Sequence, residues 1–133
     1  MKSTNNYFTI EELTKSETAN RLNINNQPSK EVIDNLNKLI NYLNPIREEW
    51  NKPIYVTSGY RSQELNSVVK GSKTSSHLLG LAVDLWVPNL YQFWDFLTNY
   101  LKDKSFDQLI LEPNWIHLGI GPKERRTILI NRI

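Results

Sequence analysis

The chain has 133 residues, a length typical of one compact domain, and we expect residues 1–133 to form a single domain. It carries 16 Lys and Arg residues against 14 Asp and Glu residues, and this net charge of +2 is too small to indicate nucleic-acid binding. Because there is no cysteine, disulfides and thiolate ligands are excluded, and imidazole and carboxylate groups would have to hold any metal ion.

The N-terminal segment carries no sign of a targeting sequence. Residues 1–7 are polar and lack the apolar run of a secretory signal. No stretch of the chain approaches the roughly 18 apolar residues that a membrane span needs. We therefore expect synthesis in the cytoplasm without a signal peptide, and no membrane span.

Residues 1–26 are expected to form an N-terminal arm. Thr9 followed three residues later by Glu12 is a capping-box pattern, in which side-chain oxygens satisfy the free N–H groups at the start of a helix. The pattern predicts a short helix after Thr9. We expect the arm to dock on the rest of the domain.

A long amphipathic helix is predicted after Pro28 and Ser29. Ser29 is a good N-cap residue, and apolar residues recur beyond it at helical spacing. These apolar positions are Val32, Leu36, Leu39, Ile40, Leu43 and Ile46. Because proline lacks an N–H group and its ring crowds the preceding turn, Pro45 is expected to kink or divide this helix. Residues 46–50 would then form a short second segment.

The remainder of the chain mixes strand and helix signals. β-branched and aromatic runs predict the strands, and apolar spacing of three to four predicts the helices. The predicted strands are 54–58, 82–87, 108–111, 115–120 and, at an edge, 127–130, and the predicted helices are 62–69 and 91–101. No repeat or low-complexity tract is present. The fold class expected is α+β, with helices packed on one side of a mostly antiparallel sheet.

The two histidines of the chain carry the chemical signal. A lone histidine is more often structural than a ligand, but His77 stands in the pattern Ser75-x-His77-x-x-Gly80-x-Ala82-x-Asp84. The glycine lets the chain reverse, so that the imidazole and the carboxylate converge. His117 can supply a third ligand from a neighbouring strand. Two nitrogens and one oxygen leave the fourth tetrahedral position open, as catalytic zinc requires.

Three motifs together resemble the zinc D-Ala-D-Ala carboxypeptidase family. In family order they are Ser58-Gly59-Tyr60-Arg61-Ser62, the pattern from Ser75 to Asp84, and Glu112-x-x-Trp115-Ile116-His117. The resemblance covers most of the chain, from about Phe8 through His117, and is strongest to short phage-endolysin-like members. It implies the fold shared with lysostaphin-type peptidases and the hedgehog amino-terminal domain.

The resemblance also implies roles for individual residues. His77, Asp84 and His117 would be the zinc ligands, and Glu112 falls where the family keeps its general acid/base. Family members vary in this spacing, and the alternative for Glu112 is a surface carboxylate in a turn. Arg61 resembles the arginine that faces the scissile carbonyl. Its alternative is a structural salt bridge.

Three further residues are candidates for contact with substrate. Ser75 would position the substrate or its own loop, although a hydroxyl two residues from a ligand can equally make a local turn bond. Tyr60, Trp86 and Trp115 could wall the cleft, and core packing is the alternative for these aromatic residues. For Trp86, core packing is the expectation.

The implied activity is zinc-dependent hydrolysis of a peptide bond involving a D-amino acid in bacterial peptidoglycan, by a carboxypeptidase or an endopeptidase. The expected partners are peptidoglycan peptides, and the expected state is a monomer that reaches the wall through phage lysis or another export route. One alternative is a non-catalytic zinc-binding module, against which Arg61 and Glu112 argue. Another is a phage-structural module that binds the wall, which the lack of repeats or a linker disfavours.

Overall fold

The computed structural model describes residues 7–131, so the first six residues of the expected arm and most of the segment considered for a signal peptide lie outside the described residues. The helices are α1 (Ile10–Thr14), α2 (Glu17–Arg21), α3 (Lys30–Trp50), α4 (Gln63–Val68), the 3-10 helix η1 (Ser76–Leu79) and α5 (Leu90–Tyr100). The strands are β1 (Tyr55–Ser58), β2 (Ala82–Trp86), β3 (Gln108–Leu111), β4 (Ile116–Gly119) and β5 (Thr127–Ile130). No helix within the described part is long and apolar enough to cross a membrane.

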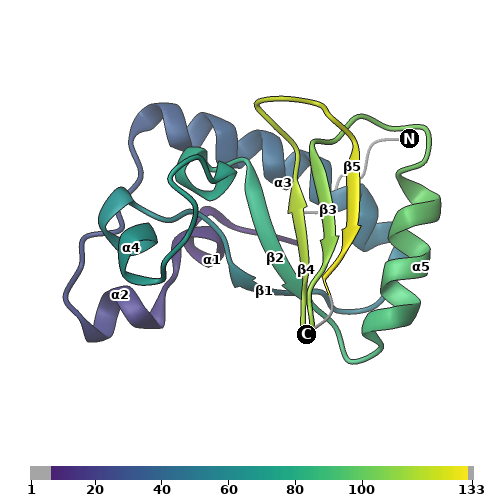
Figure 1. The fold of residues 1–133 in the computed structure, drawn as a ribbon, viewed down its shortest axis with the longest axis horizontal. Helices are drawn as coiled ribbons and strands as arrows, with labels where there is room; N and C mark the ends of the chain where they lie inside the picture. The colour runs from purple at the N-terminus through teal and green to yellow at the C-terminus, as the bar shows by residue number, and fades with distance from the viewer. Residues whose placement is uncertain (1–6, 132–133) are drawn as a thin grey trace.

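The strands form one five-stranded sheet in the order β1-β2-β4-β3-β5 (Figure 1). Neighbouring strands are antiparallel except for β3 and β5, which run parallel at one edge. The α+β class and the mostly antiparallel sheet predicted from the sequence are therefore confirmed, and residues 127–130 do form an edge strand.

The sheet has one apolar face and one polar face. Successive side chains of a strand point to opposite faces, so each row across the sheet belongs to one face. Val83, Leu118 and Leu109 form one such row, and all three are buried in the core. Helices α3 and α5 pack on this face, with α3 running behind the sheet in Figure 1. The adjacent row, Asp84 and His117 with Ile110, lies on the opposite face.

Helix α3 is continuous, so the expectation that Pro45 would divide it is wrong. Ser29 caps its start by accepting a hydrogen bond from the N–H of Val32, as predicted. Proline removes one backbone hydrogen bond, but buried Leu43 and Ile46 anchor the turns on either side of it against the core. The helix ends at Trp50, and the following residue, Asn51, caps it with a left-handed φ of 59°.

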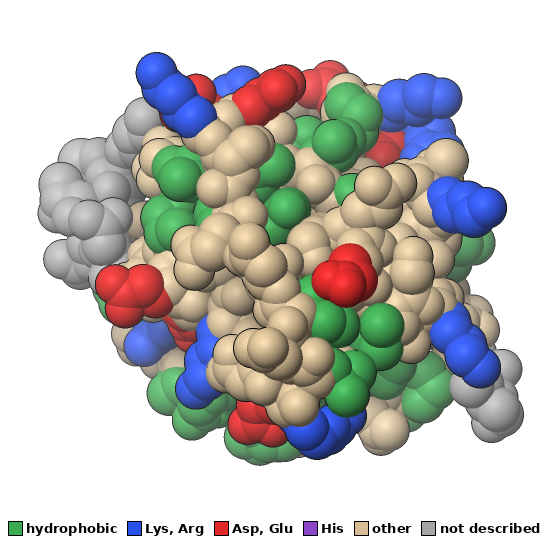
Figure 2. Space-filling model, turned by 90° about the vertical axis from the view of Figure 1, so that its left-hand side faces the viewer, with side chains coloured by type: hydrophobic (Ala, Val, Ile, Leu, Met, Phe, Trp, Pro, Cys, Tyr) green, Lys and Arg blue, Asp and Glu red, His purple; other side chains and the backbone are tan. Residues whose placement is uncertain are grey.

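The N-terminal segment packs against the loop that follows β1. Leu13 is fully buried, and its carbonyl oxygen accepts a hydrogen bond of 2.7 Å from the N–H of Tyr60. The side chain of Asn26 donates to the carbonyls of Thr14 and Tyr60 and accepts from the N–H of Ser62. These bonds tie α1 to the loop that carries Arg61. Figure 2 shows the side of the molecule where α2 and α4 lie, and no histidine is visible on it.

Candidate metal centre

His77 and Asp84 converge because the chain reverses between them. Ser75 caps η1 by accepting a hydrogen bond from the N–H of His77. Gly80 ends η1 with a φ of 75°, a backbone conformation that residues with a Cβ atom rarely adopt. The chain then enters β2, where Asp84 lies on the polar face. The short turn between the two residues thus brings imidazole and carboxylate together.

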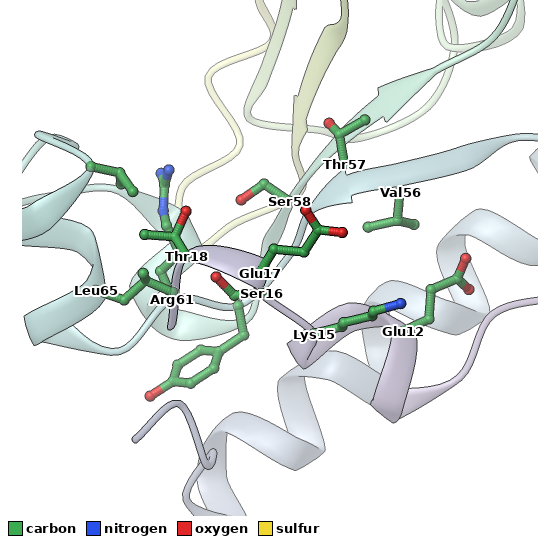
Figure 3. Close-up of a pocket in the computed structure, with 12 residues that line it drawn as sticks. Glu12, Lys15, Ser16, Glu17, Thr18, Val56, Thr57, Ser58, Arg61 and Leu65 are labelled. Carbon is green, nitrogen blue, oxygen red and sulfur yellow. The ribbon is translucent and has the colours of Figure 1, made fainter. Parts of the chain in front are cut away.

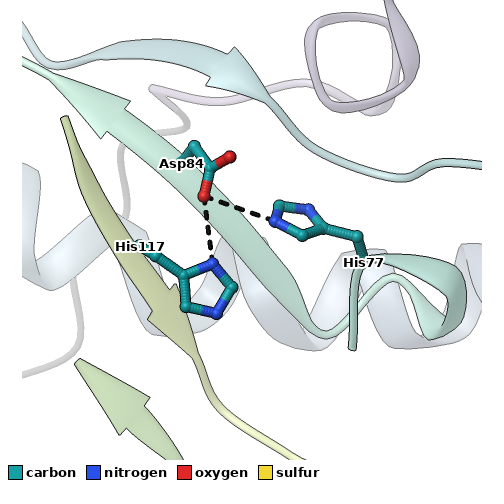
Figure 4. A group of neighbouring side chains, drawn as sticks. All are labelled: His77, Asp84 and His117. Carbon is teal, nitrogen blue, oxygen red and sulfur yellow. Dashed lines mark hydrogen bonds and ion pairs between the residues drawn. The ribbon is translucent and has the colours of Figure 1, made fainter. Parts of the chain in front are cut away.

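His117 joins them through strand pairing. It lies directly opposite Asp84 in the register of β2 and β4. Its Nδ1 atom is 3.0 Å from Asp84 Oδ1, and Nε2 of His77 is 3.3 Å from the same oxygen (Figure 4). One ligand atom from each of the three side chains lies within 4.8 Å of the other two. The structure therefore brings together the three residues that the motifs singled out.

The donor set fits a zinc ion. Ligand atoms about 2.0–2.1 Å from a tetrahedral zinc are separated from one another by about 3.3 Å, close to the two distances around Asp84. The Nδ1 atom of His77 lies 2.7 Å from the carbonyl oxygen of Gly59. A carbonyl only accepts, so Nδ1 carries the proton and Nε2 presents its lone pair toward Asp84. His77 is buried, while Asp84 and His117 are partly open to one side.

Asp84 is held in its ionised form. Its burial acts to raise the pKa, but the imidazoles of His117 and His77 beside the carboxylate outweigh burial and hold the pKa of Asp84 well below its usual range. A carboxylate that is ionised at neutral pH is ready to bind a cation. The cluster therefore needs no proton release from Asp84 to accept a metal.

A cavity of about 370 Å³ opens over this cluster. Of the candidates from the sequence, Arg61, Ser75, Glu112 and Trp115 line it together with the three metal-ligand candidates. The remaining candidate, Tyr60, lines a neighbouring cavity instead and packs partly against the core. The hydroxyl of Ser75 both makes the local turn bond and faces the metal cavity.

Arg61 lies between the two cavities. The second cavity, of about 630 Å³, is bounded by the N-terminal segment and β1, with Arg61 among its lining residues (Figure 3). Arg61 also lines the metal cavity. Its Nη2 atom donates to Ser75 Oγ over 3.4 Å, and its buried Nε has no hydrogen-bond partner. Burial lowers the pKa of Arg61, and the nearby Asp84 carboxylate opposes that effect. Arg61 forms no salt bridge with the residues that the structure describes.

Glu112 follows the last residue of β3. Its backbone N–H donates to the carbonyl of Trp115 over 2.9 Å, which closes the turn into β4. One carboxylate oxygen, Oε1, accepts a hydrogen bond of 2.7 Å from the side chain of Asn131. That bond orients the carboxylate, and Glu112 lines the metal cavity with its side chain only partly exposed.

Sequence reasoning missed several residues that line the metal cavity. Gln108 and Ile110 could have been predicted from the sequence, because strand alternation places them on the same face of the sheet as His117. Arg125 comes from a loop with no recognisable pattern. Its side chain donates hydrogen bonds of 2.7 and 3.0 Å to the carboxylate of Asp107. Asp107 is thereby engaged elsewhere and does not line the cavity.

The expectation for Trp86 is wrong. Its side chain is 40% exposed and stacks at a tilt against Tyr55, with 5.7 Å between ring centroids. Alternation along β2 places Trp86 on the same face as Asp84, and the helices that form the core cover the other face.

Comparison with known proteins agrees with this geometry. No curated protein matches the chain. The sequence model of the family described as Peptidase M15 matches residues 6–119, a range that contains all three metal-ligand candidates, Arg61 and Glu112. Because the match covers most of the sequence, the chain belongs to the peptidase M15 family.

Proposed function

We propose that residues 1–133 form a single zinc peptidase domain that hydrolyses a peptide bond involving a D-amino acid in bacterial peptidoglycan. The observation that carries this proposal is the cluster of His77, Asp84 and His117 at the floor of a cavity that also holds Glu112 and Arg61. A metal site, a candidate proton carrier and a fixed cation in one cavity are the components of metal-assisted hydrolysis.

The residues divide the reaction between them. A bound zinc ion would supply a Lewis acid that polarises the scissile carbonyl. Glu112 takes a proton from the attacking water molecule and passes it to the nitrogen of the departing amine, so that no net proton is gained by the enzyme. Arg61 donates hydrogen bonds to the carbonyl oxygen as negative charge develops on it.

The metal cavity and the second cavity that adjoins it at Arg61 give the substrate room. Ser75 and Trp115 border the metal cavity and would contact the peptide next to the scissile bond. Beyond Arg61, the second cavity would accept the continuing chain, with Tyr60 on its wall. Either a carboxypeptidase or an endopeptidase fits this arrangement. The partners are peptidoglycan peptides, reached by a monomer released through phage lysis or another export route.

A non-catalytic zinc-binding module is the alternative from another class. It would need the metal ligands but neither Glu112 nor Arg61. Both line the metal cavity, and Arg61 is half buried without a counter-ion among the described residues. Burying an unpaired guanidinium is costly, which favours a role toward substrate. A wall-binding structural module of a phage has no specific observation in its favour.

Metal analysis and a peptide-release assay test the proposal together. Purified protein supplemented with zinc is expected to hold one zinc ion per chain and to release amino groups from muropeptides. A chelator should abolish release, and added zinc should restore it. His77→Ala and His117→Ala should lose both metal and activity. Stoichiometric zinc without hydrolysis of any stem or cross-linked peptide would favour the non-catalytic module, and absence of zinc would overturn the proposal altogether.

A further inference from the structure

Arg125 is held in a fixed position at the metal cavity by a buried carboxylate. Asp107 is 1% exposed, and the sheet fixes its backbone: its N–H donates to Gly119 and its carbonyl accepts from Thr127. Asp107 accepts hydrogen bonds from Nε and Nη2 of Arg125 over 2.7 and 3.0 Å, and from the backbone N–H of Arg125 over 3.3 Å. Both the guanidinium and its loop are therefore positioned by one side chain.

Asp107 uses only some of the hydrogen-bond donors of the Arg125 guanidinium. A guanidinium has five N–H donors, and the Asp107 carboxylate accepts two of them. The other three donate to no residue that the structure describes. The side chain of Arg125 is 53% exposed and lines the metal cavity. Positioned donors thus face a space where a substrate would lie.

Arg125 and Arg61 approach the cavity from opposite sides. Arg61 follows β1 at one edge of the sheet, and Arg125 precedes β5 at the other. The metal candidates Asp84 and His117 lie on β2 and β4 between those edges. A peptide with its scissile carbonyl beside Arg61 and the metal would therefore have its next groups on the Arg125 side.

We propose that Arg125 binds a carboxylate of the wall peptide on the far side of the metal cluster from Arg61. The inference rests on the proposed function, because it takes the cavity as the substrate site. A guanidinium matches a carboxylate with two parallel hydrogen bonds, and Asp107 removes most of the entropic cost of holding the fork in place. Arg125 lies beyond the family match at residues 6–119, so this specificity would belong to the region that the match does not cover.

Two pairs of peptides test for the carboxylate and locate it. The first pair is acetyl-D-Ala-D-Ala and its C-terminal carboxamide. The second pair is capped at both ends and differs only in an internal D-Glu or D-Gln. Binding to the zinc-free protein is measured by calorimetry, and hydrolysis is measured separately on the zinc-loaded protein. We expect the acid of one pair to bind about tenfold to a hundredfold more tightly than its amide.

Arg125→Gln should reduce that preference to within about twofold while leaving the affinity for the amide unchanged. Lys123→Gln is the matched control, because it removes a positive charge from the same exposed loop but does not line the cavity. Arg125→Gln leaves the carboxylate of Asp107 buried without its partner, which could destabilise the fold. The double variant Asp107→Asn with Arg125→Gln removes that unpaired charge and so separates loss of binding from loss of folding. The double variant should lose the preference as well.

The outcomes separate the two proposals. A preference in the first pair identifies a C-terminal carboxylate, and a preference in the second identifies a side-chain carboxylate. Equal binding of acid and amide in both pairs, or a preference that survives in both Arg125 variants, overturns the role of Arg125. If the protein binds the acids selectively through Arg125 but hydrolyses nothing, the carboxylate site stands and the peptidase proposal fails.

Discussion

Replacing Gly59 with alanine should weaken both the attachment of the N-terminal segment and the metal site. A methyl group at this position would lie 2.2 Å from the carbonyl oxygen of Leu13 and 2.9 Å from its carbonyl carbon. These are backbone atoms of a fully buried residue, so no flexible side chain can move aside. The Leu13 carbonyl must shift by about 1 Å to restore ordinary contact, and the 2.7 Å bond from the N–H of Tyr60 would then be lost.

The expected cost follows from these two effects. Overpacking a closely packed site costs about 1–3 kcal/mol, and loss of a net hydrogen bond adds about 1 kcal/mol. Gly59→Ala should therefore lower the free energy of unfolding by about 2–4 kcal/mol. For a chain of this length that corresponds to a Tm lower by about 6–15 °C. Because the Gly59 carbonyl accepts the proton of His77 Nδ1, zinc affinity should also fall, by about tenfold or more.

Gly119→Ala provides the matched control. At Gly119 the nearest atom to an added methyl group would be Nε2 of His117 at 3.7 Å, an ordinary contact distance, so Gly119→Ala serves as the control for stability and the parent protein as the control for zinc affinity. Thermal unfolding of both variants, followed by circular dichroism, and competition for zinc with a chromogenic chelator measure the two effects. If Gly59→Ala unfolded within about 0.5 kcal/mol of Gly119→Ala and kept the parental zinc affinity, the proposed coupling between N-terminal segment and metal site would be refuted.

Three further substitutions test individual roles. Glu112→Gln should lower turnover by about a hundredfold to ten-thousandfold with zinc retained, since an amide cannot accept the water proton; turnover within a few-fold of the parent would assign the base elsewhere. Arg61→Lys should lower kcat by about a hundredfold to a thousandfold with little change in Tm, because an ammonium lacks the planar fork; a destabilised but fully active variant would remove Arg61 from the site. Hydrogen bonds from Arg125 lower the pKa of Asp107 in the folded protein. The ionised carboxylate therefore stabilises the fold at any pH above the pKa of about 3.9 that aspartate has in the unfolded chain. This contribution is lost as the pH falls through the lower pKa of the folded protein. Asp107→Asn should therefore destabilise the protein at pH 7, and urea titrations should show the difference from the parent shrinking below about pH 4; a difference independent of pH would contradict the assignment.

Local sequence patterns were enough to predict the elements that carry the metal cluster. The spacing from Ser75 to Asp84 encodes a cap, a turn and a strand, and each is a short-range feature of the chain. Strand alternation then predicts which side chains share the face of His117. Local rules were also enough to predict the capped start of α1 and the cap of α3 at Ser29.

Features that depend on tertiary packing were not accessible in this way. Pro45 is tolerated because buried residues on both sides of it hold α3 together, which its own sequence window does not encode. Trp86 looks like a core residue until the location of the helices shows which face is left uncovered. The pair of Asp107 and Arg125 joins residues 18 apart across a loop without a motif. Contacts of this kind become visible only once the strands are paired.

The order in which the ligands meet has a consequence for refolding. His77 and Asp84 are joined by a short turn, whereas Asp84 and His117 are 33 residues apart in sequence and meet only when β2 pairs with β4. Closing the shorter loop costs less chain entropy, so a two-ligand site can form in an otherwise unfolded chain. Zinc would then bind not only the native state but also, more weakly, the unfolded state through this two-ligand site. Zinc present during refolding should then stabilise the native protein by less than its native affinity alone implies.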